Sequence, residues 1–347
     1  MSKLFSRAKN KVLDKFFKQF LLKKKVKQGY AAFVANGVTP PDSYLAFIQL
    51  YCSTNGKHTE EFQKKLSSLH PPAPASEKIS RTLGKLSSAD FQNINTTLNK
   101  DGYACFEKKL SPEIVDRLNT FALRTPSTTP PTYSSPLIYD PQKPVAEIYR
   151  FGMNDLMSNA DIQQLIMDPA LIHIAREYLG CEPIFDFPAM WWSTSFLKEA
   201  SSEAAQLYHF DLDRVKWLKI FFYLNDVTPE NGPHCYIRGS HLTGSKPPSL
   251  LKRGYARIKD SELIPFYKKE DFKAVCASAG SIFAGDTKCW HKGTPLKKGH
   301  RLVLELEYTS SLFGTNYPKL SVKNSSEEFK QFCKNNKILA SNIIFND

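Results

Sequence analysis

Runs of apolar residues, each ended by a turn, predict strands in the second half of the chain. Residues 217–224 are almost continuously apolar and are followed by a turn cluster at 228–233. A second short run spans residues 280–286, and a third spans 301–308. Aromatic and β-branched residues of this kind fit pleated, largely buried surfaces, so the three runs predict a β-rich core.

The first part of the chain has a helical pattern. Residues 28–70 are expected to be helical, with 44–51 as an apolar core segment. Two later helices are predicted to start at Ser111-Pro112 and at Asp168-Pro169, where a capping side chain precedes a proline. Gly180 is expected to end the second of them.

A proline-rich stretch, residues 71–76, predicts a stiff linker and a domain boundary. The chain then divides into a basic helical extension with its linker (residues 1–76), one main domain (77–313) and a C-terminal tail (314–347). The length of 347 residues suits one large domain plus an extension. In the tail we expect one helix, docked on the outside.

The net charge of +13 is concentrated at the N-terminus. Residues 1–27 contain 10 Lys and Arg residues and one acid, Asp14, which gives net +9. A helical wheel of this segment has an apolar face and a basic face, as in a basic amphipathic helix. The apolar face comprises Phe5, Val12, Leu13, Phe16, Phe17 and Phe20, and the basic face comprises Lys3, Arg7, Lys11, Lys15, Lys18 and Lys25.

Three interpretations of this helix are open. In the first, the helix lies on an anionic membrane surface; in the second, it packs on the main domain or on a partner; in the third, it binds nucleic acid. No nucleic-acid-binding motif accompanies the charge, which disfavours the third. The chain shows no run of 18 apolar residues and no secretory signal, and its seven scattered cysteines have no CxxC or zinc spacing. We therefore expect reduced thiols and a cytoplasmic protein, located at the inner face of a membrane if the helix binds there.

Two potential metal ligands, His209 and Asp211, are separated by one residue. Side chains alternate between the faces of an extended strand, so both project to the same side. A second imidazole, His291, follows 80 positions after Asp211, and Arg301 comes 10 positions later. Two imidazoles and a carboxylate on one face of an octahedral ion form the ligand set of non-haem Fe(II) oxygenases. The planar fork of Arg301 suits the far carboxylate of a 2-oxo acid that chelates the iron.

Several segments around these residues resemble the phytanoyl-CoA dioxygenase-like family. The resemblance covers roughly residues 88–313. The segments that carry it are Asp101-Gly102-Tyr103, Leu110-Ser111-Pro112-Glu113, Tyr208-His209-Phe210-Asp211, residues 225–234, Gly239-Ser240-His241, and Trp290-His291 with Arg301.

The resemblance implies a mainly β fold with flanking helices, a double-stranded β-helix or jelly-roll, cupin-like barrel, here with an N-terminal helical extension. It implies an enzyme that uses Fe(II), with 2-oxoglutarate and O2 as cosubstrates, and releases succinate and CO2. Carried over to this chain, it makes His209, Asp211 and His291 the catalytic iron ligands and Arg301 the 2-oxoglutarate anchor. Related halogenases have a small residue in place of the carboxylate. This chain keeps Asp211, which favours hydroxylation.

Some assignments stay open at this point. Thr194, Ser195, Gln206 and Thr294 are candidates to contact the cosubstrate. The lysine-rich residues 242–273, between the two halves of the predicted iron site, form either a lid or a solvated loop. The substrate is expected to be a small molecule, a lipid or a glycolipid, and the basic extension and insert favour an anionic or membrane-resident one. The alternative function is a non-catalytic jelly-roll that binds a metal or ligand and has a basic membrane- or partner-binding extension.

Overall fold

The computed structural model describes residues 2–72, 79–80, 82–132, 135–197, 200–202 and 204–346. For residues 2–12, 15, 79, 80 and 85 it describes the backbone alone. Residues 73–76 of the predicted linker lie outside the described residues, so that linker stays a prediction.

Two antiparallel sheets form the centre of the molecule. In the described part of the chain, the larger sheet has seven strands. In spatial order they are β3 (Tyr103–Lys109), β10 (Ser281–Gly285), β7 (Trp217–Tyr223), β12 (His300–Thr309), β6 (Ile184–Thr194), β5 (Ile148–Phe151) and β4 (Ser127–Thr128). The smaller sheet consists of β11 (His291–Gly293), β8 (His234–Ile237) and β9 (Phe272–Val275). The three predicted strand runs are confirmed as β7, β10 and β12.

The two sheets face each other as the walls of a jelly-roll barrel, which confirms the predicted fold class. The ring of Tyr236 on β8 stacks on that of Tyr103 on β3, with centroids 5.0 Å apart. The ring of His234 lies 4.7 Å from that of Phe221 on β7. These contacts close the barrel interior between the sheets.

Side-chain alternation on β7 and β12 separates two environments. Even-numbered residues such as Leu218, Ile220 and Leu304 belong to the main hydrophobic core outside the barrel. Odd-numbered residues such as Lys219 and Glu305 line a cavity inside it. The barrel interior therefore receives the charged residues of these two strands.

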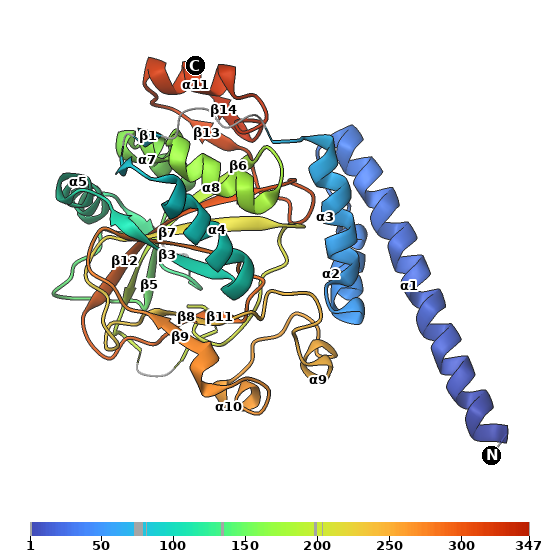
Figure 1. Cartoon of the computed structure of the whole chain (residues 1–347). Helices are drawn as coiled ribbons and strands as arrows, with labels where there is room; N and C mark the ends of the chain where they lie inside the picture. Colours follow the sequence, from blue (N-terminus) through green and yellow to red (C-terminus); the bar gives the residue numbers. More distant parts are fainter. Residues whose placement is uncertain are drawn as a thin grey trace.

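Helices cover the outer face of the large sheet and one flank of the barrel (Figure 1). Ser111 and Asp168 cap α5 and α8 as predicted, and Gly180 ends α8 with a φ of 70°. The helices outside the extension are α4 (Ser88–Asp101), α5 (Pro112–Arg124), α6 (Met153–Met157), α7 (Ala160–Ile166), α8 (Pro169–Leu179), α9 (Pro248–Leu251), α10 (Asp260–Leu263), a 3-10 turn η1 (Lys269–Asp271) and α11 (Glu327–Asn335). The helix predicted in the tail is α11, which lies at the edge of the molecule. Two short pairs complete the fold: β1 (Ile79–Ser80) with β2 (Gly84–Lys85), and β13 (Leu320–Val322) with β14 (Ile343–Phe345).

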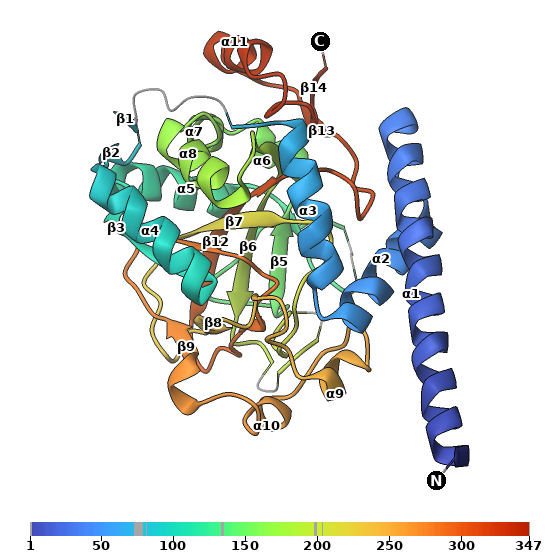
Figure 2. The ribbon, with the colours of Figure 1, turned by 45° about the vertical axis from the view of Figure 1, so that its right-hand side comes forward.

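The extension folds as α1 (Ser2–Asn36), α2 (Pro41–Thr54) and α3 (Lys57–Leu69), with α1 outermost (Figure 2). Phe313, just after β12, meets Tyr30 of α1 and Phe62 of α3 edge-on, with ring centroids 5.6 and 5.9 Å away. The same apolar cluster contains Phe47 of α2 and Phe210 of the barrel. The extension therefore shares a core with the segment that carries His209 and Asp211.

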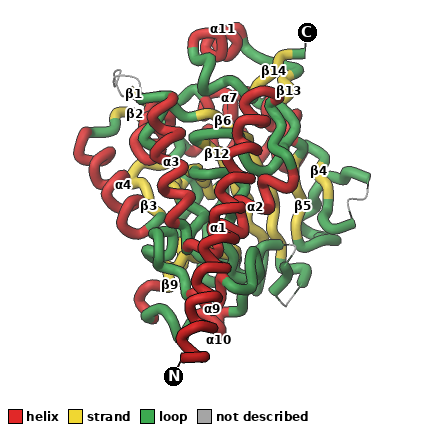
Figure 3. The backbone as a smooth tube through the Cα atoms, turned by 90° about the vertical axis from the view of Figure 1, so that its right-hand side faces the viewer, coloured by secondary structure: helices red, strands yellow, loops and turns green. Residues whose placement is uncertain are grey.

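The predicted basic helix is the first part of the long, continuous α1, which lies across the outer face of the molecule (Figure 3). Farther along α1, Val26 is buried and Leu22 and Tyr30 are half-buried against the extension's core. Four apolar side chains of the first part, which we call the apolar arc, are instead exposed. They are Leu13, Phe16, Phe17 and Phe20, at 63%, 66%, 64% and 62% exposure. No helix in the described residues is long and apolar enough to cross a bilayer.

Candidate metal centre

Backbone pairing brings two distant segments together at the centre of the barrel. The amide of His209 donates to the carbonyl oxygen of His291 at 3.0 Å, and the amide of His291 donates back at 2.9 Å. The amide of Asp211 donates to the carbonyl oxygen of Thr287 at 2.8 Å. His209 and Asp211 thus lie on an extended segment with isolated bridges rather than on the regular strand that their spacing predicted, because this segment pairs with β11 at one residue only.

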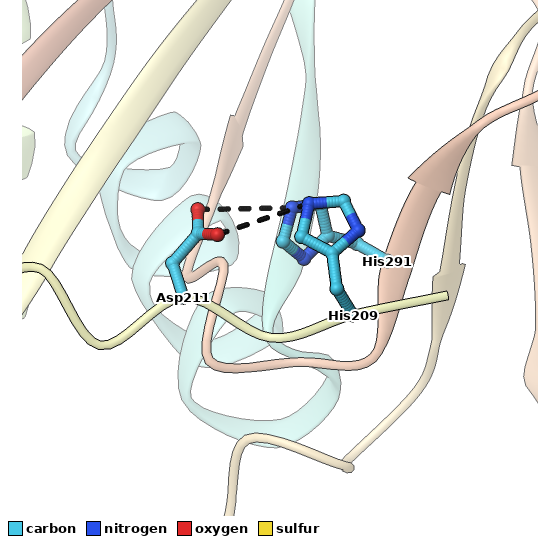
Figure 4. Close-up of side chains that lie close together, drawn as sticks. All are labelled: His209, Asp211 and His291. Atoms are coloured by element: carbon cyan, nitrogen blue, oxygen red, sulfur yellow. Dashed lines mark ion pairs between the residues drawn. The ribbon is translucent and has the colours of Figure 1, made fainter. Parts of the chain in front are cut away.

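The side chains of His209, Asp211 and His291 point toward one another (Figure 4). The Nε2 atom of His209 lies 3.8 Å from Oδ1 of Asp211, and Nε2 of His291 lies 3.7 Å from Oδ2. One ligand atom from each residue can be chosen so that all three lie within 4.8 Å of one another. All three residues are buried. This is a compact group of two nitrogens and one oxygen that can hold a metal ion.

The other ring nitrogens orient the two imidazoles. Nδ1 of His209 lies 2.9 Å from the carbonyl oxygen of Leu207, and Nδ1 of His291 lies 3.0 Å from that of Cys289. A carbonyl oxygen only accepts hydrogen bonds, so each Nδ1 must carry the proton. The lone pair of each Nε2 then faces the centre, which is the tautomer that a metal requires.

Burial and charge set the protonation states that metal binding needs. Burial lowers the pKa of His209 well below its ordinary value and also lowers that of His291, so both rings are neutral near pH 7. Burial opposes ionisation of Asp211, but the charge of the nearby Lys219 ammonium favours it. The pKa of the Asp211 carboxyl group therefore lies below its usual value.

Lys219 on β7 contacts the carboxyl group of the ligand Asp211 and two further carboxyl groups on β12. Its Nζ lies 3.2 Å from Oδ2 of Asp211 and 3.3 Å from one carboxylate oxygen each of Glu305 and Glu307. The register pairs Lys219 directly with Glu307 across β7 and β12. One ammonium, whose side chain is 13% exposed, thus faces three carboxyl groups. Burial raises the pKa values of Glu305 and Glu307, so Asp211 is the most readily ionised of the three and offers its charge to a cation.

The cavity beside the three ligands has a volume of about 430 Å³, and Arg301 is part of its lining. Arg301 is 3% exposed; its Nη2 donates to the Ser193 hydroxyl at 3.3 Å, while Nε and Nη1 have no partner among the described residues. A Cβ at Gly293 would lie 3.4 Å from Nη2, so the missing side chain leaves space beside the guanidinium. A buried guanidinium with unpaired N–H groups fits an organic acid in this cavity.

The other predicted cosubstrate contacts are engaged with the protein. The Thr194 hydroxyl donates to the carbonyl oxygen of Ala146 at 2.6 Å, and that of Thr294 donates to Pro233 at 2.6 Å. The Gln206 side-chain oxygen accepts from the amide of Ser201 at 3.0 Å. None of these three residues lines the cavity, and neither does Ser195. Their contact with a cosubstrate stays a prediction.

Several cavity residues escaped the sequence reasoning, among them Lys219, His234, Arg257 and Glu305. A signal existed for two of them, because a lone lysine in the apolar run 217–224 and charges at alternate positions of 301–308 are out of place on buried strands. Arg257 belongs to the lysine-rich insert, which pairs with the ligand segment through Ile258 and Tyr208. That contact favours the lid over the solvated loop.

Comparisons with known proteins complete the description. The chain matches the sequence model described as phytanoyl-CoA dioxygenase (PhyH) over residues 98–300. Among curated proteins, none matches significantly. The fold is similar to AviO1 from Streptomyces viridochromogenes Tue57, with 16% identity, a TM-score of 0.45, and coverage of 67% of this chain and 100% of that chain. It is also similar to HygX from Streptomyces hygroscopicus, solved with nickel and 2-oxoglutarate, with 16% identity, a TM-score of 0.46 and coverage of 71% and 94%. A third similar fold is that of EctD from S. alaskensis, solved with 2-oxoglutarate and 5-hydroxyectoine. The sequence identity is 17%, the TM-score is 0.46, and the match covers 69% of this chain and 82% of that chain.

Proposed function

The chain belongs to the phytanoyl-CoA dioxygenase family of Fe(II)- and 2-oxoglutarate-dependent oxygenases, and from that premise we propose that His209, Asp211 and His291 are its iron ligands and that Arg301 anchors 2-oxoglutarate. The observation that carries this assignment is that three buried ligand atoms and a buried guanidinium with unpaired N–H groups meet in one cavity. Bound iron, with 2-oxoglutarate and O2 as cosubstrates, supplies the oxidising power, and 2-oxoglutarate leaves as succinate and CO2.

Each protein group has a separate task in this proposal. The two neutral imidazoles present Nε2 because the backbone carbonyls of Leu207 and Cys289 hold their Nδ1 protons. Lys219 holds the Asp211 carboxylate in place through its 3.2 Å contact. Arg301 pairs with the distal carboxylate of 2-oxoglutarate through its free N–H groups. These are interactions of geometry and charge, and the difficult oxidation is left to the iron and its cosubstrates.

We propose hydroxylation of a small molecule or of the end of a lipid or glycolipid. The Asp211 carboxylate occupies the position that related halogenases leave open, which favours hydroxylation. The cavity has an apolar side, formed in part by Met153, Phe187 and Trp191, while Arg257 of the insert borders it. This lining suits a substrate with an apolar portion and a nearby anionic group.

The apolar arc of α1 supports peripheral contact with an anionic membrane. Four large apolar side chains, each more than 60% exposed, lie in the segment that carries most of the chain's net positive charge. Each basic residue near an anionic surface contributes about 1 kcal/mol, and shallow burial of aromatic rings adds to it. Such attachment would be reversible and weakened by salt.

The enzyme assignment is tested on anaerobically purified protein. We expect about one iron per chain in the wild type and little in the His209→Ala variant, with succinate formed from 2-oxoglutarate once O2 is admitted. Equal iron in the two proteins would disprove the ligand assignment. Binding of iron and 2-oxoglutarate without succinate formation, even in the presence of candidate substrates, would favour the non-catalytic alternative.

The membrane proposal is tested by co-sedimentation with phosphatidylserine-containing vesicles at low and high salt. The full chain should sediment at low salt only, and the Phe16→Ser/Phe17→Ser/Phe20→Ser variant should stay in the supernatant. Val34→Ser is the matched control, since Val34 is 66% exposed at the packed end of α1. Full-length protein that ignores vesicles, or that self-associates through these phenylalanines instead, would show the membrane proposal to be wrong.

A further inference from the structure

His234, the first residue of β8, is a buried histidine without a side-chain partner. It is 7% exposed and lines the cavity that contains the metal ligands. Its backbone amide donates to the Tyr223 hydroxyl at 3.0 Å, but Nδ1 has no partner, and no hydrogen bond to either ring nitrogen occurs within the described residues. Buried polar groups are normally paired, because leaving one unpaired costs on the order of 1–3 kcal/mol. An imidazole in this state indicates a ligand.

The strand register places His234 next to the space in front of Arg301. Within the small sheet, His234 pairs with Gly293 and Tyr236 pairs with His291. Cross-strand partners project to the same face, so His234 and the metal ligand His291 share the face that lines the cavity. Gly293 has no side chain, and a Cβ there would lie 3.4 Å from Nη2 of Arg301. The imidazole of His234 and the guanidinium of Arg301 therefore border the same small gap.

Other polar groups near this gap are engaged or point elsewhere. The Tyr223 hydroxyl donates to the carbonyl oxygen of Val275 at 3.1 Å. The Tyr236 hydroxyl lies against Gly285, where a Cβ would come within 2.4 Å of it. Val303, the next inward-facing residue after Arg301 on β12, has no hydrogen-bonding group. Among the cavity-lining residues that the structure describes around Gly293, unpaired N–H donors remain on Arg301 and His234.

We propose that His234 donates a hydrogen bond to the distal carboxylate of 2-oxoglutarate beside Arg301, and so makes the cavity selective for a dicarboxylic 2-oxo acid. The inference rests on the proposed function, because it needs the cosubstrate to chelate a metal held by the three ligands. A carboxylate has two oxygens with several lone pairs, so it can accept from the guanidinium and from an imidazole together. Hydrogen bonds to charged groups of this kind correspond to about a tenfold to hundredfold change in affinity.

The test compares two acids on the intact, Ni(II)-loaded protein, where binding is measured by calorimetry without turnover. 2-Oxoglutarate has the distal carboxylate, and pyruvate, which chelates through the same 2-oxo acid group, lacks it. His234→Phe keeps a flat ring between its aromatic neighbours and removes the donor. We expect the Kd for 2-oxoglutarate to rise at least tenfold and that for pyruvate to stay within about twofold. His234→Gln, which keeps an N–H donor, should recover much of the lost affinity.

Two further variants serve as a replacement for His234→Phe and as a control. His234→Leu repeats the test if the Phe variant does not fold. His241→Phe is the matched control, because His241 also has a buried Nδ1 without a partner but lies outside the metal cavity. It should leave both dissociation constants unchanged.

Each outcome is decisive for one of the two proposals. If His234→Phe or His234→Leu weakens both acids equally or neither, His234 does not bind the distal carboxylate, and this inference is wrong while the proposed function stands. If the wild-type protein fails to bind Ni(II) or 2-oxoglutarate at all, the proposed function itself fails, and the inference fails with it.

Discussion

The interior of the barrel and the outer surface of α1 each contain the kind of residue expected at the other. Inside the barrel, the buried Glu305 and Glu307 and the largely covered Lys219 are ionisable groups in a place normally filled by apolar side chains. On α1, Phe16 and Phe20 are exposed aromatic rings in a place normally occupied by polar ones. Both arrangements are costly for an isolated protein, so each indicates an interaction.

The two regions differ in how much of that interaction is already present. The interior charges are paired with one another, and the gaps that remain, at the metal ligands, Arg301 and His234, are small and have defined geometry. The apolar arc has no gap of defined shape, because its side chains are exposed on the surface of one helix. A buried gap therefore specifies its ligand by position and charge, whereas an exposed face specifies only the class of partner.

The largest expected effect comes from removing the cation at the centre of the interior network. Lys219→Met leaves three buried carboxyl groups without their ammonium, which should lower the free energy of unfolding by about 3–5 kcal/mol. The loss should shrink as the pH falls. Burial already raises the pKa values of Glu305 and Glu307, and without Lys219 the pKa values of all three carboxyl groups rise, so the folded variant takes up more protons and is favoured toward acid pH. Urea denaturation at several pH values measures both effects.

The matched change on the outer helix is Lys18→Met, which should alter stability by less than about 0.5 kcal/mol because Lys18 is exposed. If the two substitutions cost the same, Lys219 is not the centre of a buried charge network.

Metal binding at His209, Asp211 and His291 should have the next largest effect on the free energy of unfolding. Ni(II) at 100 times its Kd should stabilise the wild type by about 2.7 kcal/mol, because the ion binds the folded state. The His209→Ala protein should gain much less. Thermal denaturation with and without Ni(II) makes the comparison, and equal stabilisation of both proteins would place the metal elsewhere.

Arg301 tests the second gap in the interior. Arg301→Lys replaces a planar fork with a single ammonium, so the KM for 2-oxoglutarate should rise by about tenfold or more, which corresponds to at least about 1.4 kcal/mol. Steady-state succinate assays measure it. An unchanged KM would mean that another cation, with Arg257 the first to examine, anchors the cosubstrate.

The smallest effect on folding is expected at the apolar arc. Phe16→Ser/Phe17→Ser/Phe20→Ser should change the free energy of unfolding by no more than about 0.5 kcal/mol, because these rings have few contacts to lose. Phe313→Ala, in the core shared with the extension, should cost about 3–5 kcal/mol. Urea denaturation curves of the two variants and the wild type measure both free-energy changes. A large loss in the triple variant would mean that the arc packs on the protein in solution.

Local patterns were enough to predict the parts of the molecule governed by short-range rules. The caps at Ser111 and Asp168, the strand runs, and the spacing of His209 and Asp211 depend on neighbouring residues, and alternation or capping chemistry makes them readable. His291 could be joined to the other two ligands because the family resemblance supplied the long-range connection.

The remainder depends on strand register, which the sequence does not display. Lys219 meets Glu307 only because β7 and β12 pair at that position. Thr194 pairs with His300, one position away from the Ser193–Arg301 pair, so its side chain projects to the face opposite that of Arg301, which the sequence alone does not reveal. The role proposed for His234 has no sign in the sequence for the same reason, since its nearness to Arg301 follows from its pairing with Gly293.

Phe313 has a consequence for the order in which the chain can fold. Its ring completes the cluster formed by Tyr30, Phe47 and Phe62 on the three N-terminal helices. Those helices are synthesised first, but Phe313 follows Phe62 by about 250 residues, which takes on the order of tens of seconds at ribosomal speed. During that interval the helices cannot complete their core, and their apolar faces stay open to chaperones or to neighbouring nascent chains. The final step of folding should therefore join the two ends of the chain and, through Phe210, bring the segment with His209 and Asp211 into register.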